Sequence, residues 1–162
     1  MFLVGWWGSF RVGELLAKEH TKFDAKKDLL ASDITFHEGS VSVWIRSPKV
    51  NTSTTGVVVE VWGVKGRLDL DPVTALSTFL KLRKDKFGEA EELPVFMHEN
   101  GSLYSKQEMN RDLTDLLAFF PQLATSRDKW SGHSFRSGLS TILSLLGFSK
   151  VNVLNLSRPP RN

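Results

Sequence analysis

The sequence contains no cysteine, which excludes disulfide bonds and metal sites built on cysteine ligands. It also has no apolar run long enough to cross a membrane, because the N-terminal run over residues 1–7 is short and Arg11 and Glu14 soon follow it. That run lacks the basic leader and the cleavage site of a signal peptide. The net charge is +3, which is compatible with a nucleic-acid partner but too small to indicate one.

What remains is the composition of an ordinary globular domain. Of the 162 residues, 41% are hydrophobic and 24% are charged, so the chain has enough apolar material for a core. No repeat, low-complexity tract or linker divides it, which predicts a single unit over residues 1–162. An apolar helix that starts at the first residues without a cap leads us to expect that a parent protein extends upstream.

Short strands are predicted in the first half of the chain, after a helix over residues 2–18. Residues 33–37, 41–46 and 57–62 are rich in β-branched or alternating apolar residues. The polar segment 47–56 joins the last two of them. This pattern predicts a small three-stranded antiparallel sheet.

The second half is predicted to be helical, apart from a short strand over residues 93–97. Asp71 and Pro72 form a helix start, and a capping box opens at Ser105. Two later helices share one spacing of apolar residues, which are Met109, Leu113, Leu116, Leu117 and Phe120 in the first and Phe135, Leu139, Ile142, Leu143 and Leu146 in the second. A final short helix is expected over residues 150–156. The predicted fold class is therefore α+β, mainly helical with a small three-stranded antiparallel sheet.

His133 and Arg136 are three residues apart near the start of the last long helix, so they would lie on one face of it. An arginine binds two phosphate oxygens and a histidine donates one further hydrogen bond, so such a pair can clamp a phosphate. The plainer interpretation is a surface helix whose basic residues share no role. Spacing alone favours the plainer one, because a His-x-x-Arg match is frequent by chance.

Arg11 is a positive charge inside an apolar segment, where a charge is costly unless it is paired or bound. Glu14, one helical turn later, could pair with it and hold its guanidinium in place. An ion pair with no further role explains the same two residues equally well. Lys49 falls in the loop between the second and third predicted strands. A lysine there is usually only solvated, although a loop can also bring a proton donor to a leaving group.

Taken in order, these residues resemble the catalytic domain of the tyrosine recombinases, the phage-integrase family. The matching pattern is Arg11-x-x-Glu14-Leu15 on a helix, Lys49 on a hairpin, and His133-x-x-Arg136 on a late helix. The linking segments 68–73, 93–96 and 100–101 are similar as well, and 132–138 and 146–148 are most like recombinases of DIRS- and Crypton-type mobile elements of eukaryotes. The resemblance runs from Gly5 to Arg158, and its specificity lies in the order of the motifs.

The resemblance implies a role for each matched residue. Arg11 and Arg136 would clamp the scissile phosphate and offset the charge of its transition state, and His133 would hydrogen-bond the same phosphate. Lys49 would protonate the 5′-oxygen leaving group as the general acid, and Glu14 would orient Arg11. The family needs no metal and no small-molecule cofactor. Its nucleophile is a tyrosine that forms a 3′-phosphotyrosyl link.

The chain departs from the family pattern after the His-x-x-Arg helix. The family continues to a Gly-His or Gly-Trp motif and then to the tyrosine, but residues 151–162 contain no histidine, tryptophan or tyrosine. The single tyrosine, Tyr104, precedes His133 and is interpreted as a packing or turn residue. We therefore expect an incomplete, C-terminally truncated catalytic domain that does not cleave DNA alone, and a homo-oligomer would not restore the nucleophile. We also expect these residues not to include the separate DNA-grasping domain of the family, so their binding should be weak and salt-sensitive.

Two functions follow as expectations. The first is an integrase-like DNA-binding domain derived from a transposable element, which works on DNA in the nucleus, with homo-oligomeric assembly on DNA as a further expectation and no membrane partner. The second is a domesticated, non-enzymatic module, for protein interaction or DNA binding, with an exposed apolar surface around Trp6, Trp7 and Leu154. Replacing Arg11 and Arg136 together would separate the two.

Overall fold

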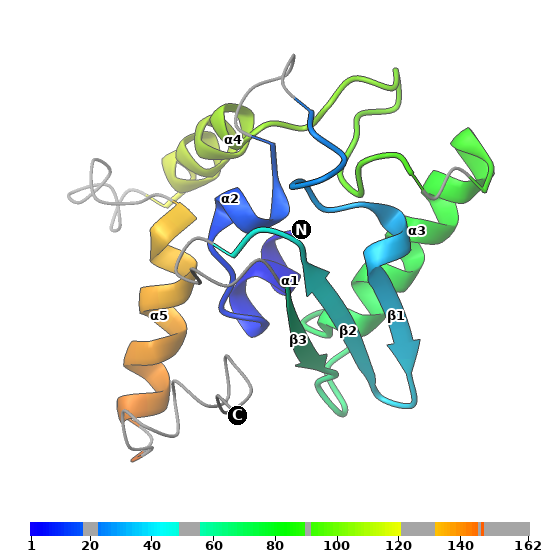
Figure 1. Ribbon diagram of the computed structural model, residues 1–162. Coiled ribbons are helices and arrows are strands. Elements are labelled where there is room, and N and C mark those ends of the chain that lie inside the picture. Colours follow the sequence, from blue (N-terminus) through cyan, green and yellow to red (C-terminus); the bar gives the residue numbers. More distant parts are fainter. Residues whose placement is uncertain (18–22, 49–55, 90–91, 121–131, 146, 148–162) are drawn as a thin grey trace.

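The computed structural model describes residues 1–17, 23–48, 56–89, 92–120, 132–145 and 147 of the chain. This part combines helices with a three-stranded antiparallel sheet, which confirms the predicted α+β class (Figure 1). In chain order the elements are α1 (Phe2–Trp7), α2 (Val12–Leu15), the 3-10 helix η1 (Ala31–Asp33), β1 (Ile34–His37), β2 (Ser40–Ile45), β3 (Val57–Trp62), α3 (Pro72–Phe87), α4 (Lys106–Ala118) and α5 (Gly132–Leu145).

The sheet has the order β1-β2-β3, so that β2 lies in its centre. In the β2–β3 pair Val43 lies opposite Val59 and Val41 opposite Val61, and all four side chains are buried. The residues between them face outward, as the two-residue period of a strand requires. The predicted strands are confirmed: β3 has the expected bounds, β1 begins one residue later than expected, and β2 begins and ends one residue earlier.

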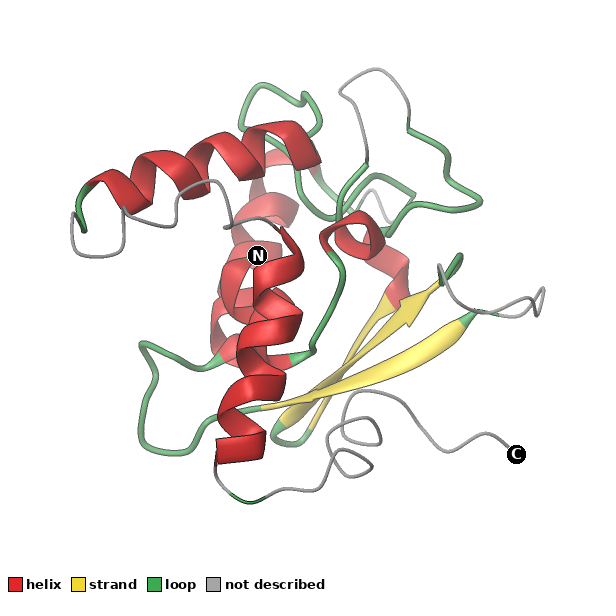
Figure 2. Cartoon of the chain, turned by 90° about the vertical axis from the view of Figure 1, so that its left-hand side faces the viewer, coloured by secondary structure: helices red, strands yellow, loops and turns green. Residues whose placement is uncertain are grey.

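Helix α1 lies in the middle of the molecule and contacts β3, α3 and α5 (Figure 1). One continuous core joins the inner face of the sheet to α1, α2, α3 and α4. Its most deeply buried members are Val4, Phe10, Val41, Val43, Val61, Leu76, Val95 and Met109. Figure 2 shows α5 in front of this core, with α4 running across its N-terminal end. The N-terminal residues are thus central to the packing.

The prediction of one helix over residues 2–18 was wrong, because a tight turn separates α1 from α2. A Cβ atom on Gly8 would lie 2.1 Å from Cε2 of the Phe10 ring, so only glycine fits there. Ser9 has a φ of 51°, in the left-handed region that side chains disfavour. Phe10 turns into the core with 1% of its surface exposed, and its N–H donates to the carbonyl of Gly5 at 3.0 Å. The chain therefore leaves the helix at the point where the Phe10 ring is buried, and the helical spacing of apolar residues does not predict this burial.

Both predicted helix starts in the second half are present. The Asp71 carboxylate accepts hydrogen bonds from the backbone N–H groups of Val73 and Thr74 at 3.1 and 3.3 Å. Burial by itself would raise the pKa of Asp71, but these bonds and one from the Thr74 hydroxyl outweigh it and lower that pKa. The Ser105 hydroxyl accepts from the N–H of Glu108 at 3.3 Å and starts α4. Local capping chemistry thus sets where both helices begin.

The strand predicted over residues 93–97 is absent, and this prediction was wrong. Pro94 meets Leu30 only in an isolated bridge. It has no N–H to donate, and its carbonyl accepts a hydrogen bond from Nε of the buried Arg83 at 3.1 Å. A ladder cannot extend through such a residue, so the segment is a buried connection rather than a fourth strand.

The apolar stripes of the last two helices are wider than their buried faces. On α4, Met109, Leu113 and Leu117 are buried and Leu116 is exposed, and Phe120, just past the end of the helix, is exposed as well. On α5, Leu139 is buried, Leu143 is half-buried and Ile142 is exposed. The side chain of Phe135, Leu146 and the helix expected over residues 150–156 lie outside the described residues.

Candidate functional site

Arg11 lies at the N-cap of α2, one residue before the helix, and not in a helix interior as predicted. Its backbone N–H donates to Oε2 of Glu14 at 2.8 Å, and its Nη1 donates to Oε1 of the same carboxylate at 3.2 Å. The Glu14 side chain is 8% exposed and that of Arg11 is 26% exposed. The predicted pair is therefore present. Because a guanidinium carries several N–H donors, one carboxylate oxygen does not saturate it.

The late helix that carries His133 and Arg136 is α5, and both residues lie in its first two turns. At this spacing they share one side of the helix. The side chain of His133 lies outside the described residues. Arg136 is half-buried and has an interaction partner. The structure thus confirms the helix on which the two residues lie, and their roles remain predictions.

Helices α1 and α5 pack against each other, which brings the two arginine-bearing segments to one side of the molecule (Figures 1 and 2). The contact lies at Gly138, two residues after Arg136, where the Trp6 indole covers the glycine. The tight turn over residues 8–10 joins α1 to Arg11. The helix that carries His133 and Arg136 therefore contacts α1, and the turn after α1 leads directly to Arg11. Lys49 lies outside the described residues.

An ion pair that sequence reasoning missed holds the end of β2, just before the segment with Lys49. Nε and Nη2 of Arg46 each donate to a carboxylate oxygen of Asp33 at 2.7 Å. Asp33 has a side chain that is 1% exposed, and the hydrogen bonding raises the pKa of Arg46. The guanidinium also lies 4.8 Å from the centroid of the Trp44 ring. Opposite charges near the paired ends of two predicted strands were the signal for this anchor.

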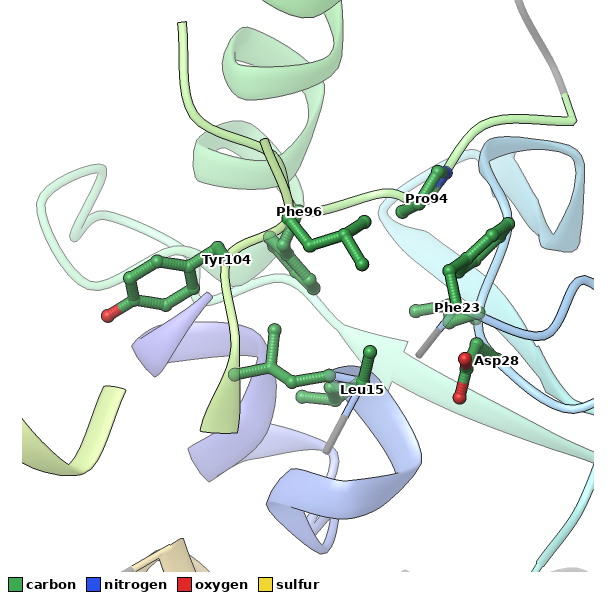
Figure 3. Close-up of a pocket in the computed structure, with 10 residues that line it drawn as sticks. Leu15, Phe23, Asp28, Pro94, Phe96 and Tyr104 are labelled. Atoms are coloured by element: carbon green, nitrogen blue, oxygen red, sulfur yellow. The ribbon is translucent and has the colours of Figure 1, made fainter. Parts of the chain in front are cut away.

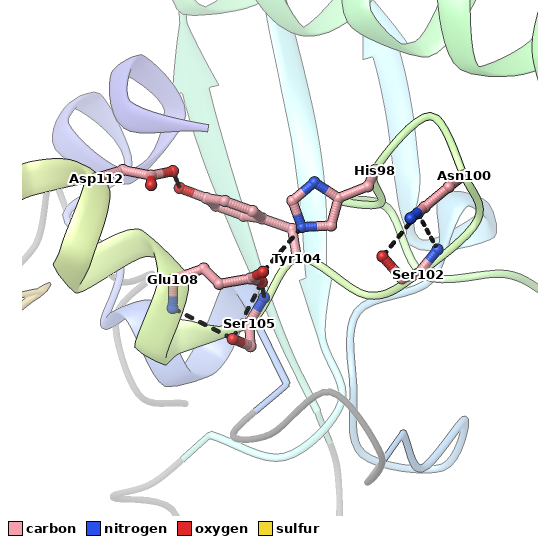
Figure 4. Close-up of polar contacts among 7 residues, drawn as sticks. All are labelled: His98, Asn100, Ser102, Tyr104, Ser105, Glu108 and Asp112. Atoms are coloured by element: carbon pink, nitrogen blue, oxygen red, sulfur yellow. Dashed lines mark hydrogen bonds and ion pairs between the residues drawn. The ribbon is translucent and has the colours of Figure 1, made fainter.

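Tyr104 belongs to a polar cluster at the start of α4 (Figure 4). Its hydroxyl donates to Oδ2 of Asp112 at 2.6 Å, and its ring meets His98 edge-on with 5.4 Å between centroids. The His98 ring lies 3.2 Å from Oε1 of Glu108, and Oε2 of the same carboxylate accepts from the N–H of Ser105 at 2.9 Å. Burial and the hydrogen bond to Asp112 raise the pKa of the Tyr104 phenol well above its usual range. These contacts support the interpretation of Tyr104 as a packing residue.

A small pocket opens between the end of α2 and the segments around Asp28 and Pro94 (Figure 3). Its wall is mostly apolar and includes Leu15, Leu16, Ala17, Phe23, Leu29, Phe96, Leu103 and Tyr104. None of the arginines or the histidine predicted for the site lines it. Its chemistry does not suit an anion, because Asp28 is the charged group in its wall.

The candidate site therefore lies outside this pocket. Arg11, held by Glu14, and Arg136 on the neighbouring helix provide donors suited to phosphate oxygens. Among the described residues, no three histidine, aspartate or glutamate side chains gather closely enough to hold a metal ion. None of the helices in the described part of the chain is long and apolar enough to cross a membrane.

Comparison with known proteins gives structural matches only. No protein-family model matches the sequence, and no curated protein matches it. Among solved structures, the XerA recombinase is similar with a TM-score of 0.62 and 19% identity over 98% of this chain and 47% of that one. The XerH site-specific recombinase, solved with its difH substrate in a pre-cleavage complex, has a TM-score of 0.63 and 14% identity over 99% of this chain and 38% of that one.

At these identities the likeness shows the fold. The chain spans less than half the length of either recombinase, and the arrangement of its helices and sheet is like that of a tyrosine-recombinase catalytic domain. The fold class predicted from the sequence is thereby confirmed. The likeness was visible in the sequence only through the order of its motifs, because identity is so low.

Proposed function

We propose that the chain binds the phosphate backbone of DNA in the manner of a tyrosine-recombinase catalytic domain, with Arg11 and Arg136 as the two arms of a phosphate clamp. The observation that carries this proposal is the guanidinium of Arg11, which a nearly buried Glu14 holds in place while 26% of the Arg11 side chain stays exposed. An arginine that is already oriented loses less freedom when it binds an anion. The recombinase fold, seen on DNA in XerH, supports the same proposal.

Each remaining residue of the motif takes the part that the resemblance implies. His133 donates a hydrogen bond to the phosphate held by the arginines, since it precedes Arg136 by one helical turn. Lys49 approaches the leaving oxygen as a proton donor. Glu14 orients Arg11 through the two hydrogen bonds that it accepts. None of these roles uses a metal or a small-molecule cofactor.

We propose further that these 162 residues bind DNA without cutting it. A tyrosine nucleophile attacks as its phenolate. Tyr104, the one tyrosine of the sequence, instead donates its proton to Asp112 at 2.6 Å, and its pKa is raised. Incubation with a nicked duplex followed by denaturing electrophoresis should give no covalent protein–DNA band. A band that disappears in Tyr104→Phe would contradict this.

The test of DNA binding is the double variant Arg11→Ala/Arg136→Ala, measured by fluorescence anisotropy on a labelled duplex. Loss of two phosphate contacts should weaken binding by about a hundredfold or more, because hydrogen bonds to charged groups contribute about 1.5–3 kcal/mol each. The dependence of log K on log salt should also become shallower by about two units. Circular dichroism checks that the variant remains folded.

A matched control removes the same charge elsewhere. Arg67 is exposed and paired with Asp69 at 2.8 Å, and Lys81 is exposed on α3. Arg67→Ala/Lys81→Ala has the same net charge as the double clamp variant. Equal losses of affinity in the two double variants would mean that DNA binding depends only on the net charge of the protein, and the proposed phosphate clamp would be wrong.

The second candidate function is a protein-binding module, and exposed aromatic residues favour it. Trp6 is half-buried against α5, and Trp7 is 38% exposed with its indole N–H donating to the Leu70 carbonyl at 3.0 Å. Leu154 lies outside the described residues. Trp44 and Trp62 are 42% and 63% exposed on the outer face of the sheet. A folded double-arginine variant with unchanged DNA binding would favour this function.

Origin, location and assembly are the finer parts of the proposal. We propose a transposable-element ancestor, with DNA in the nucleus as the target, on the basis of the resemblance of residues 132–138 to mobile-element recombinases. Assembly as a homo-oligomer on DNA is proposed on the same basis. Imaging of a tagged chain in a eukaryotic cell tests the location, and sedimentation with and without duplex tests the assembly.

A further inference from the structure

The contact between α1 and α5 leaves no room for a side chain at position 138 of α5. A Cβ atom built on Gly138 would lie 2.6 Å from both Cη2 and Cζ3 of the Trp6 indole, closer than such atoms approach one another. The indole is a rigid plane, and Trp6 is half-buried between the helices. At Gly138 the indole ring therefore lies directly against the backbone of α5.

On the α1 side, this contact is linked firmly to Arg11. The N–H of Ser9 donates to the carbonyl of Trp6 itself at 3.0 Å, and that of Phe10 donates to Gly5 at 3.0 Å. Phe10 is locked in the core, and Arg11 is the next residue. Any movement of Trp6 relative to α5 is thus a movement of Arg11 relative to α5.

On the α5 side, Gly138 is two residues from Arg136 in the same regular helix. A helix transmits a displacement with little loss over such a distance, because every turn is hydrogen-bonded. Hydrogen bonds to a phosphate, in turn, weaken steeply outside donor–acceptor distances of about 2.7–3.2 Å. A shift of about one ångström between the helices is therefore enough to break one arm of a clamp.

We propose that Trp6 and Gly138 are positioning residues that set the separation of Arg11 and Arg136, and with it the fit of the clamp to a phosphodiester. This inference rests on the proposed function for its purpose, but the spacing itself is a property of the folded chain. Neither residue touches the phosphate. Their role is to hold two arginines from distant parts of the sequence at one separation.

The spacing is tested without DNA. The chain has no native cysteine, so spin labels at Gly13→Cys and Thr141→Cys, both exposed positions, report the α2–α5 distance alone. In this labelled chain the distance should increase from Gly138 to Gly138→Ala and again to Gly138→Leu. In Trp6→Leu/Gly138→Ala the distance should return to its value with Gly138, because the ring that meets the new methyl group is gone. Distances that do not change with the residue at position 138 overturn the proposal.

The consequence for binding is tested in the unlabelled chain. Gly138→Ala should weaken binding to a short duplex by about tenfold, the loss of one charged hydrogen-bonding arm, and Trp6→Leu/Gly138→Ala should recover most of it. Gly13→Ala is the matched control, because a Cβ there meets nothing within 4 Å. Circular dichroism confirms that each variant is folded, so a loss of affinity in a folded variant reports the position of the arginines.

The outcomes separate the two proposals. A longer label distance together with weaker, rescuable DNA binding supports the positioning role. A longer distance with unchanged DNA affinity overturns it. If the unaltered chain binds no DNA, the proposed function fails, and the label distances still decide whether Trp6 sets the spacing.

Discussion

Helices α2 and α4 begin with the same backbone arrangement but differ in what surrounds it. In each, a glutamate at the third helical position accepts a hydrogen bond from the N–H of the residue before the helix, from Arg11 to Glu14 at 2.8 Å and from Ser105 to Glu108 at 2.9 Å. Such a glutamate satisfies a donor that a helix otherwise leaves unpaired. The same local chemistry therefore stands at two places with different surroundings.

The difference lies in the residue at the N-cap. Ser105 is fully buried, and its hydroxyl completes the cap. Arg11 contributes no acceptor, and its side chain extends to the surface while Glu14 holds it at 3.2 Å. The start of α4 is therefore buried and fully capped, and it contributes to stability. The start of α2 instead carries a partly exposed guanidinium in a fixed orientation, which is suited to binding a phosphate.

The largest effect in this comparison is expected for Glu108→Ala. It removes the acceptor for the buried N–H of Ser105 and the partner of His98, so we expect a loss of about 2 kcal/mol in the free energy of unfolding. Urea denaturation measures this loss. Glu89→Ala, which breaks the exposed pair with Lys84, is the control and should cost less than about 1 kcal/mol. Similar values for both would remove the distinction between a closed cap and a surface pair.

Tyr104→Phe should have the next largest effect, about 1 kcal/mol at neutral pH, because it removes the hydrogen bond to Asp112. The pKa of Tyr104 is raised in the folded state, so its contribution is complete below the unfolded pKa of about 10 and is lost as the pH rises above that value. The difference in unfolding free energy between the two proteins should therefore shrink above about pH 10. A constant difference from neutral to strongly alkaline pH would contradict the raised pKa.

The smallest effect is expected at Glu14, and it should appear in DNA binding rather than in stability. Glu14→Ala frees the Arg11 guanidinium and should lower DNA affinity about threefold, which is less than 1 kcal/mol. Glu14→Gln keeps an acceptor oxygen and removes the charge that repels phosphate, so its affinity should equal or exceed that of the unaltered chain. If both variants bind more tightly, Glu14 acts only through its charge and does not position Arg11.

The parts predicted correctly are those with local causes. The alternation of residues 41–46 predicted β2, because side chains on a strand face opposite sides in turn. The β-branched residues of 57–62 predicted β3. Asp71 and Ser105 predicted helix starts because capping bonds join residues that are close in sequence. The pair of Arg11 and Glu14 was predicted for the same reason, although its setting in a helix interior was wrong. Periodicity could not show the turn at Ser9.

The sequence by itself determined the α+β class, the three strands, the starts of α3 and α4, and the pairing of the Arg11 guanidinium with the Glu14 carboxylate. Only the tertiary structure decided that α1 lies against α5, that Asp33 pairs with Arg46, and that the Trp6 ring rests on Gly138. The physical reason is distance along the chain. Caps and periodicity depend on residues a few positions apart, whereas these contacts join segments that only the packing of the whole core brings together.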